Sequence, residues 1–73
     1  MLSEETVLKA IVECMDEERN AMFVKVMAYL GCEGKPLLHF IKALKFKGYI
    51  TQTLYDAHVT DSGMREYNRI FRE

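Results

Sequence analysis

The sequence predicts a mostly helical α+β domain with three helices, a short β-hairpin and a last helix. Apolar residues recur at intervals of three and four positions in four stretches of the chain, as expected for helices with one buried face. Two short runs of β-forming residues lie between residues 49 and 60, before the last of these stretches. The chain has 73 residues, which is near the lower size for a self-sufficient core, so we expect one domain over 1–73.

The first helix is expected from about Glu4 to Met15. Ser3 precedes it and is a good N-cap, because its hydroxyl can accept a hydrogen bond from a backbone N–H of the first turn. Apolar residues then follow at helical spacing on one face: Val7, Leu8, Ile11, Val12 and Met15. The polar residues 16–20 interrupt this pattern and end the helix.

The second helix is expected after Asn20, a residue type that often caps a helix N-terminus. Its apolar positions are Phe23, Val26, Met27 and Leu30. The helix should stop at Gly31, because glycine takes the left-handed conformation of a helix C-terminus without steric penalty.

A turn over Cys32–Gly34 leads to the third helix, expected over Pro36–Lys47. Proline suits the first helical position, where its missing N–H is not needed, and Gly48 supplies the stop. At about 100° per residue, this helix has an apolar side and a basic side. The apolar side holds Leu37, Phe40, Ile41 and Leu44, and the other side holds Lys35, Leu38, His39, Lys42, Lys45 and Phe46.

The hairpin is expected to pair Tyr49–Thr53 with His58–Thr60 across a connection that contains no glycine. Thr60 is predicted to be the N-cap of the last helix. The inner side of that helix is predicted to hold Met64, Tyr67, Ile70 and Phe71.

Charge is divided unevenly along the chain, although the formal net charge is only -1. Residues 1–34 carry seven acids and three bases, whereas residues 35–73 carry seven bases and four acids. No acidic residue occurs from Lys35 through Tyr55. The third helix is therefore expected to present a local basic face that can contact phosphates, in a protein without strong long-range attraction for polyanions.

Several other kinds of protein do not fit the sequence. Acids follow the initiating methionine where a secretory signal needs bases, and the apolar residues 21–30 are too few to span a bilayer, so we expect a cytoplasmic protein without a membrane segment. Cys14 and Cys32 lack ligand spacing with each other and with His39 or His58, so we expect reduced thiols and no metal site. The absence of any phosphate loop or nucleophile motif argues against an enzyme and against a cofactor.

Residues 24–50, VKVMAYLGCEGKPLLHFIKALKFKGYI, resemble the winged helix-turn-helix domains of transcription regulators, such as MarR-like and PadR-like proteins. The similarity lies in the order and spacing of several short motifs along nearly the whole chain. These are Leu30-Gly31, then Leu37, Ile41 and Leu44, then Lys47-Gly48-Tyr49-Ile50, and finally His58-Val59-Thr60-Asp61-Ser62-Gly63. The resemblance implies a three-helix core, a hairpin wing and a C-terminal helix.

The resemblance also implies that the chain binds double-stranded DNA and regulates transcription. In such domains the second helix of the turn motif enters the major groove, which assigns this role to the helix over 36–47. The implied DNA-binding residues are Gly34, Lys35, Leu38, His39 and Lys42 at the groove, with Lys45 nearer a phosphate. The last helix of such domains often makes a dimer contact, so a homodimer through Tyr67, Ile70 and Phe71 is expected as an alternative to a monomer.

Winged helices also serve as protein-interaction modules, which leaves a second function open. Leu38 and Phe46 are apolar residues on the basic side of the third helix, and Tyr55 is expected at the wing tip. These three residues are the candidates for contact with a protein partner. A continuous positive surface over the third helix and the wing would favour DNA, whereas an apolar interruption would favour a protein partner.

Overall fold

The structure is a computed structural model that describes residues 1–72, and this part of the chain contains four helices and three strands. In chain order they are α1 (Glu4–Cys14), β1 (Asn20–Met22), α2 (Phe23–Leu30), α3 (Gly34–Phe46), β2 (Ile50–Gln52), β3 (Asp56–Val59) and α4 (Asp61–Phe71). The prediction of a mostly helical α+β domain is confirmed. No helix in residues 1–72 is long and apolar enough to cross a membrane.

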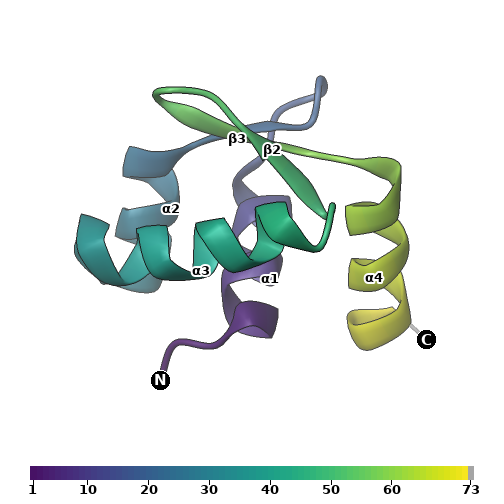
Figure 1. Cartoon of the computed structure of the whole chain (residues 1–73), viewed down its shortest axis with the longest axis horizontal. Helices are drawn as coiled ribbons and strands as arrows, with labels where there is room; N and C mark the ends of the chain where they lie inside the picture. Colours follow the sequence, from purple (N-terminus) through teal and green to yellow (C-terminus); the bar gives the residue numbers. More distant parts are fainter. Residues whose placement is uncertain (73) are drawn as a thin grey trace.

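Helix α1 occupies the centre of the molecule and contacts the three other helices. Figure 1 shows α3 crossing in front of α1, with α2 and α4 on opposite sides of α1 and the strands along one end. The core consists of buried residues from every helix and from all three strands: Val7, Leu8, Ala10, Ile11, Ala21, Val26, Leu37, Ile41, Leu44, Ile50, Ala57, Val59 and Tyr67. The apolar faces predicted for α1 and α3 are thus the faces that meet.

The three strands form an antiparallel sheet in the order β1–β3–β2. The predicted hairpin is present, with Ile50 opposite Val59, but β3 begins at Asp56, in the segment expected to be the connection, and ends before Thr60. Strand β1 was not predicted, and Asn20 is not the cap of the second helix as expected. Asn20 lies in β1 opposite His58, and its Oδ1 is 3.0 Å from the His58 Nδ1. A strand of three residues is too short to show a periodicity. Its partner strand lies 38 residues away, so no neighbouring segment indicates the pairing either.

Two helix boundaries also differ from the sequence prediction. Helix α2 begins at Phe23 without a side-chain cap, directly after β1. Helix α3 begins at Gly34 rather than Pro36, so Pro36 occupies the third helical position. Proline is accommodated there because the first four N–H groups of a helix have no intrahelical partner. The predicted stop of α2 is confirmed, since Gly31 has the left-handed conformation with φ 65°.

Candidate functional site

Helix α3 is held with one side against the core and the other toward solvent. Its inner side is fixed by Leu37, Ile41 and Leu44, which are all fully buried. A short turn connects it to α2, whose C-terminal end is capped by the N–H of Cys32 donating to the Met27 carbonyl at 3.1 Å. Phe40 is half-buried and packs against the same core, while the side chains on the opposite side of the helix point outward.

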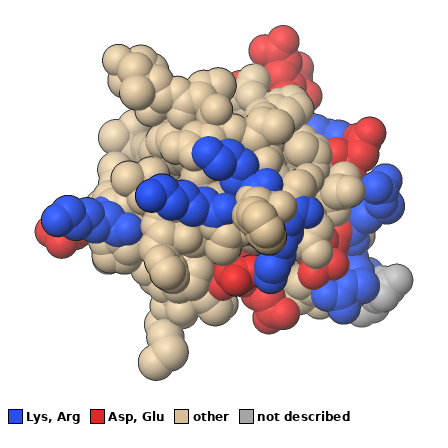
Figure 2. All heavy atoms as spheres, in the orientation of Figure 1, with Lys and Arg blue, Asp and Glu red and all other residues tan. Residues whose placement is uncertain are grey.

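The structure brings the predicted basic residues together on this outward side. Lys35, His39, Lys42 and Lys45 are all exposed, Leu38 is 41% exposed, and Gly34 is half-buried. Figure 2 shows Lys and Arg spheres in a band across this face of the molecule, over the position of α3 in Figure 1. We call Lys35, Lys42 and Lys45 the lysine row.

The lysine row forms none of the ion pairs within residues 1–72. Those pairs join Arg19 to Asp61, Lys47 to Glu4 and Arg69 to Glu66. Within the row, the Lys45 Nζ donates a hydrogen bond to the neutral Gln52 Oε1 of β2 at 3.2 Å. The three ammonium groups are therefore not neutralised by a carboxylate of the described chain, and they are available to a negatively charged ligand.

Lys47 differs from the lysine row, although it lies on the same segment. Its Nζ is 2.5 Å from the Glu4 Oε1, so it links the C-terminal end of α3 to the start of α1. The hydrogen bond and the negative charge of Glu4 raise the pKa of Lys47 above its ordinary value. Lys47 therefore contributes less to a free positive surface than its place in the sequence indicates.

The hairpin does not continue the positive surface of α3. Residues 51–58 contain neither Lys nor Arg, and the tip presents Leu54 and Tyr55, which are 79% and 72% exposed. In Figure 2 the region occupied by the hairpin tip in Figure 1 is tan, next to the blue band of α3. An apolar surface thus borders the lysine row on the side of the hairpin.

A groove of about 340 Å³ lies between α2, α3 and the hairpin. Its lining is mainly apolar and consists of Phe23, Met27, Gly34, Leu37, Leu38, Gln52 and Leu54. We call it the hairpin groove. It contains Leu38 from the predicted partner-binding set, but neither Phe46 nor Tyr55.

Leu54 is the exposed residue of this groove that the sequence prediction missed. The other lining residues that were not predicted site residues are Phe23, Met27, Leu37 and Gln52. Leu54 lies in the hairpin connection, where polar residues and glycine are usual, and a large aliphatic side chain at such a position was the available signal. Phe46 is 92% exposed at the C-terminal end of α3, about two helical turns from Leu38. The three predicted partner-binding residues are therefore spread along the face rather than gathered in one pocket.

The residues predicted for a dimer contact occupy different environments on α4. Tyr67 is 6% exposed and belongs to the core, and its hydroxyl donates to the Glu13 Oε2 at 2.8 Å. This hydrogen bond and burial raise the pKa of Tyr67. Ile70 is half-buried, while Phe71 is 36% exposed and packs beside the Tyr67 ring. Of these three residues, Ile70 and Phe71 have side-chain surface that could contact a second copy of the chain, and Tyr67 does not.

The thiol groups and a second hollow lie away from the outward side of α3. Cys14 and Cys32 are free and half-buried. Among residues 1–72, no group of three or more His, Cys, Asp and Glu side chains is arranged to hold a metal ion. A second hollow of about 460 Å³ between α1, α3 and α4 contains the Glu4–Lys47 ion pair.

No family model matches this chain, and neither a curated protein nor a solved structure matches it.

Proposed function

We propose that this chain is a winged helix-turn-helix domain that binds double-stranded DNA and regulates transcription. In this proposal α2 and α3 are the helix-turn-helix, and β2 and β3 are the wing. Support comes from the order of elements, the short turn after Gly31, and the exposed position of α3. The observation that carries the proposal is the lysine row, whose charges have no acidic partner on the described chain.

Helix α3 would lie in the major groove with its N-terminal half toward the bases. Lys35, His39 and Lys42 can donate hydrogen bonds to guanine or to phosphate oxygens, and Lys45 would lie nearer the backbone. Gly34 has no side chain to keep the backbone from the DNA. A Cβ at Gly34 would meet nothing closer than the Met27 Sδ at 3.8 Å, so internal packing does not require glycine there.

The direct test is titration of random-sequence duplex DNA at two salt concentrations. With about four phosphate contacts per protomer, log K should fall with log[salt] at a slope of about -3.6. The double variant Lys35→Glu/Lys42→Glu should abolish binding, because it places two negative charges against the phosphates. The single variant Lys42→Glu should weaken binding, and Lys9→Glu on α1, which reverses one charge as well, is its matched control and should bind as the wild type does. Absence of binding by the wild type at low salt would refute the proposal, as would full binding by the double variant.

The exposed apolar residues favour a second candidate function, binding of a protein partner on the same face. Leu38, Phe46 and Tyr55 are 41%, 92% and 72% exposed, and the hairpin supplies no positive charge for DNA. If a partner binds there, Phe46→Ala should weaken its binding while Lys42→Ala preserves it. The opposite order of effects would favour DNA.

A further inference from the structure

The hairpin groove combines an apolar floor with a basic rim. Its floor and walls come from three elements: Phe23 and Met27 of α2, Leu37 and Leu38 of α3, and Leu54 of the hairpin. Leu38 of α3 and Leu54 of the hairpin are the two lining residues with exposed apolar side chains. Bringing one large apolar side chain against them would remove apolar surface of both proteins from water.

The lysine row follows the rim of this groove on α3. Lys35 is adjacent to the lining residue Gly34, and Lys42 lies one turn beyond Leu38 on the same helix face. Lys45 bonds to Gln52, which lines the groove from β2. Glu33, the exposed N-cap of α3, is the acidic residue at the groove end of the helix, directly before Gly34. Three lysines and one acidic residue of this segment thus lie beside the apolar hollow, so its surroundings on α3 are positive on balance.

We propose that the hairpin groove binds an acidic segment of a partner protein that carries a large aliphatic or aromatic side chain. The apolar side chain would enter the groove beside Leu38 and Leu54, and the flanking carboxylates would contact the lysine row. Charge complementarity specifies the acidic partner, and the apolar lining specifies the anchoring side chain. Duplex DNA matches this combination less well, because its phosphates can satisfy the lysines while its base faces remain stacked inside the double helix.

A second copy of this chain fits the groove less well than a different protein. Asp16, Glu17 and Glu18 form an exposed acidic run without an intervening apolar residue, and at the N-terminus, where Met1 is exposed, Glu4 is already paired with Lys47. The acidic run can supply carboxylates but no anchor. The occupant is therefore assigned to another protein.

Such a partner would cover the same lysines as DNA, so its binding would exclude DNA from α3. This consequence rests on the proposed DNA-binding function, whereas binding of the acidic segment does not. The groove would then be a regulatory site. A protein bound there would displace DNA, because its carboxylates would pair with the lysine row and its apolar side chain would fill the hairpin groove.

Binding can be measured by fluorescence anisotropy with a labelled 12-residue peptide of Asp and Glu that contains Phe-Leu at its centre. We expect saturable binding, with NMR shift changes around Leu38 and Leu54. A peptide of equal charge with Ser-Ser at the centre should bind about tenfold more weakly, since it lacks the anchor. Equal affinity for the two peptides would overturn the proposal, because charge alone would then account for the binding.

Leu54→Ser tests the groove itself and should weaken binding of the Phe-Leu peptide about tenfold. The change is made at a 79% exposed position, so the fold should be retained, and a thermal melt verifies it. Val24→Ser is the matched control, because Val24 is 57% exposed on α2 and does not line the groove. Unchanged affinity of Leu54→Ser, or an equal loss in Val24→Ser, would contradict the proposal.

Duplex DNA separates this inference from the proposed function. Peptide binding without DNA binding would refute the DNA-binding function and its regulation while retaining the groove as a protein site. DNA binding without peptide binding would refute the groove proposal alone. If both bind, unlabelled Phe-Leu peptide should displace the DNA, and simultaneous binding of both would refute the regulatory role.

Discussion

At the scale of single residues, Gly63 is the position where the fold depends most directly on the absence of a side chain. It lies buried in the first turn of α4, and a Cβ built on it would be 2.1 Å from the Tyr49 carbonyl oxygen. The contact is with backbone, which cannot rotate away as a side chain can. Glycine is therefore required by the close approach of α4 to the segment before β2.

Gly63→Ala is expected to lower the free energy of unfolding by about 3 kcal/mol, because the backbone must shift to accept the added methyl group. Urea unfolding followed by circular dichroism measures this change. Gly34→Ala is the matched control, since its Cβ would make ordinary contact at 3.8 Å. That variant should be as stable as the wild type or slightly more stable, through the smaller entropy of its unfolded chain. Similar stability of both variants would show that the approach at Gly63 is not tight.

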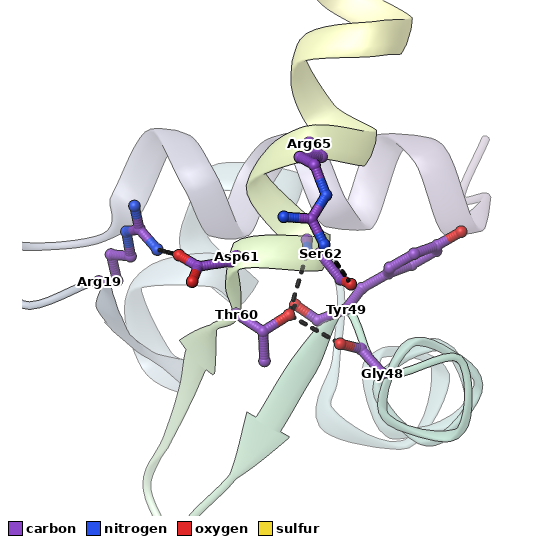
Figure 3. A network of polar contacts seen from close by, with 8 residues as sticks. Arg19, Gly48, Tyr49, Thr60, Asp61, Ser62 and Arg65 are labelled. Atoms are coloured by element: carbon purple, nitrogen blue, oxygen red, sulfur yellow. Dashed lines mark hydrogen bonds and ion pairs between the residues drawn. The ribbon is translucent and has the colours of Figure 1, made fainter.

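At the scale of elements, Thr60 joins the start of α4 to the end of the α3–β2 connection. Its Oγ1 accepts a hydrogen bond from the Gly63 N–H at 3.0 Å, as predicted for an N-cap. The same hydroxyl is 2.7 Å from the Gly48 carbonyl oxygen and 3.0 Å from that of Tyr49, to which it donates. Figure 3 shows these contacts converging on Thr60, with the Arg19–Asp61 pair beside them. One side chain thus caps a helix and fixes its position against a second segment.

Thr60→Val should lower the free energy of unfolding by about 1–2 kcal/mol, because it keeps the side-chain shape but removes both roles of the hydroxyl. Thr60→Ser retains the hydroxyl and should lose less. Both values come from the same urea titration. A larger loss in Thr60→Ser than in Thr60→Val would mean that packing of the threonine methyl, rather than the cap, stabilises this junction.

The Arg19–Asp61 pair ties the loop before β1 to the first turn of α4, with a distance of 2.6 Å between the Arg19 Nη1 and the Asp61 Oδ1. The hydrogen bond and charge of Arg19 lower the pKa of Asp61 below its ordinary value of 3.8. A carboxyl whose pKa is lower in the folded state stabilises the protein above its ordinary pKa. This contribution is lost as the pH falls through the pKa of the folded state.

Asp61→Asn should therefore melt at a lower temperature than the wild type at neutral pH, and the difference should shrink below about pH 4. The effect should be small, because both side chains are substantially exposed. Thermal melts of both proteins between neutral and acidic pH test it. A melting difference that grows on acidification would contradict the assigned direction of the pKa change.

At the scale of the whole molecule, the sequence allowed prediction of the features that depend on local periodicity. The buried side and the basic side of α3 follow from the spacing of its apolar residues. The end of α2 at Gly31 follows from the conformational freedom of glycine, and the cap of α4 at Thr60 follows from the hydrogen-bonding hydroxyl of threonine. Strand β1 and the hairpin groove were not predicted, since each exists only where distant segments meet. The pairing of Lys47 with Glu4 was missed for the same reason, because 43 positions separate them.

This long-range pair leads to a prediction about DNA affinity. Lys47→Gln should reduce DNA affinity less than Lys42→Gln, because the Lys47 charge is already satisfied by Glu4. The two variants remove equal charge from the same segment, so each serves as a control for the other in the duplex titration. A greater loss in Lys47→Gln would mean that DNA displaces Glu4 and that the free-charge argument for α3 is incorrect.

The hydrogen bond from the Phe23 N–H to the Tyr55 carbonyl, at 2.9 Å, anchors the backbone of the hairpin tip to the start of α2. Together with the pairing of β1 to β3, it restrains the hairpin from swinging away from the helices. The distance across the hairpin groove is thus set before any ligand arrives. A ligand that enters would lose its own conformational freedom but would not have to order this wall, and preorganisation of this kind favours affinity in a small interface.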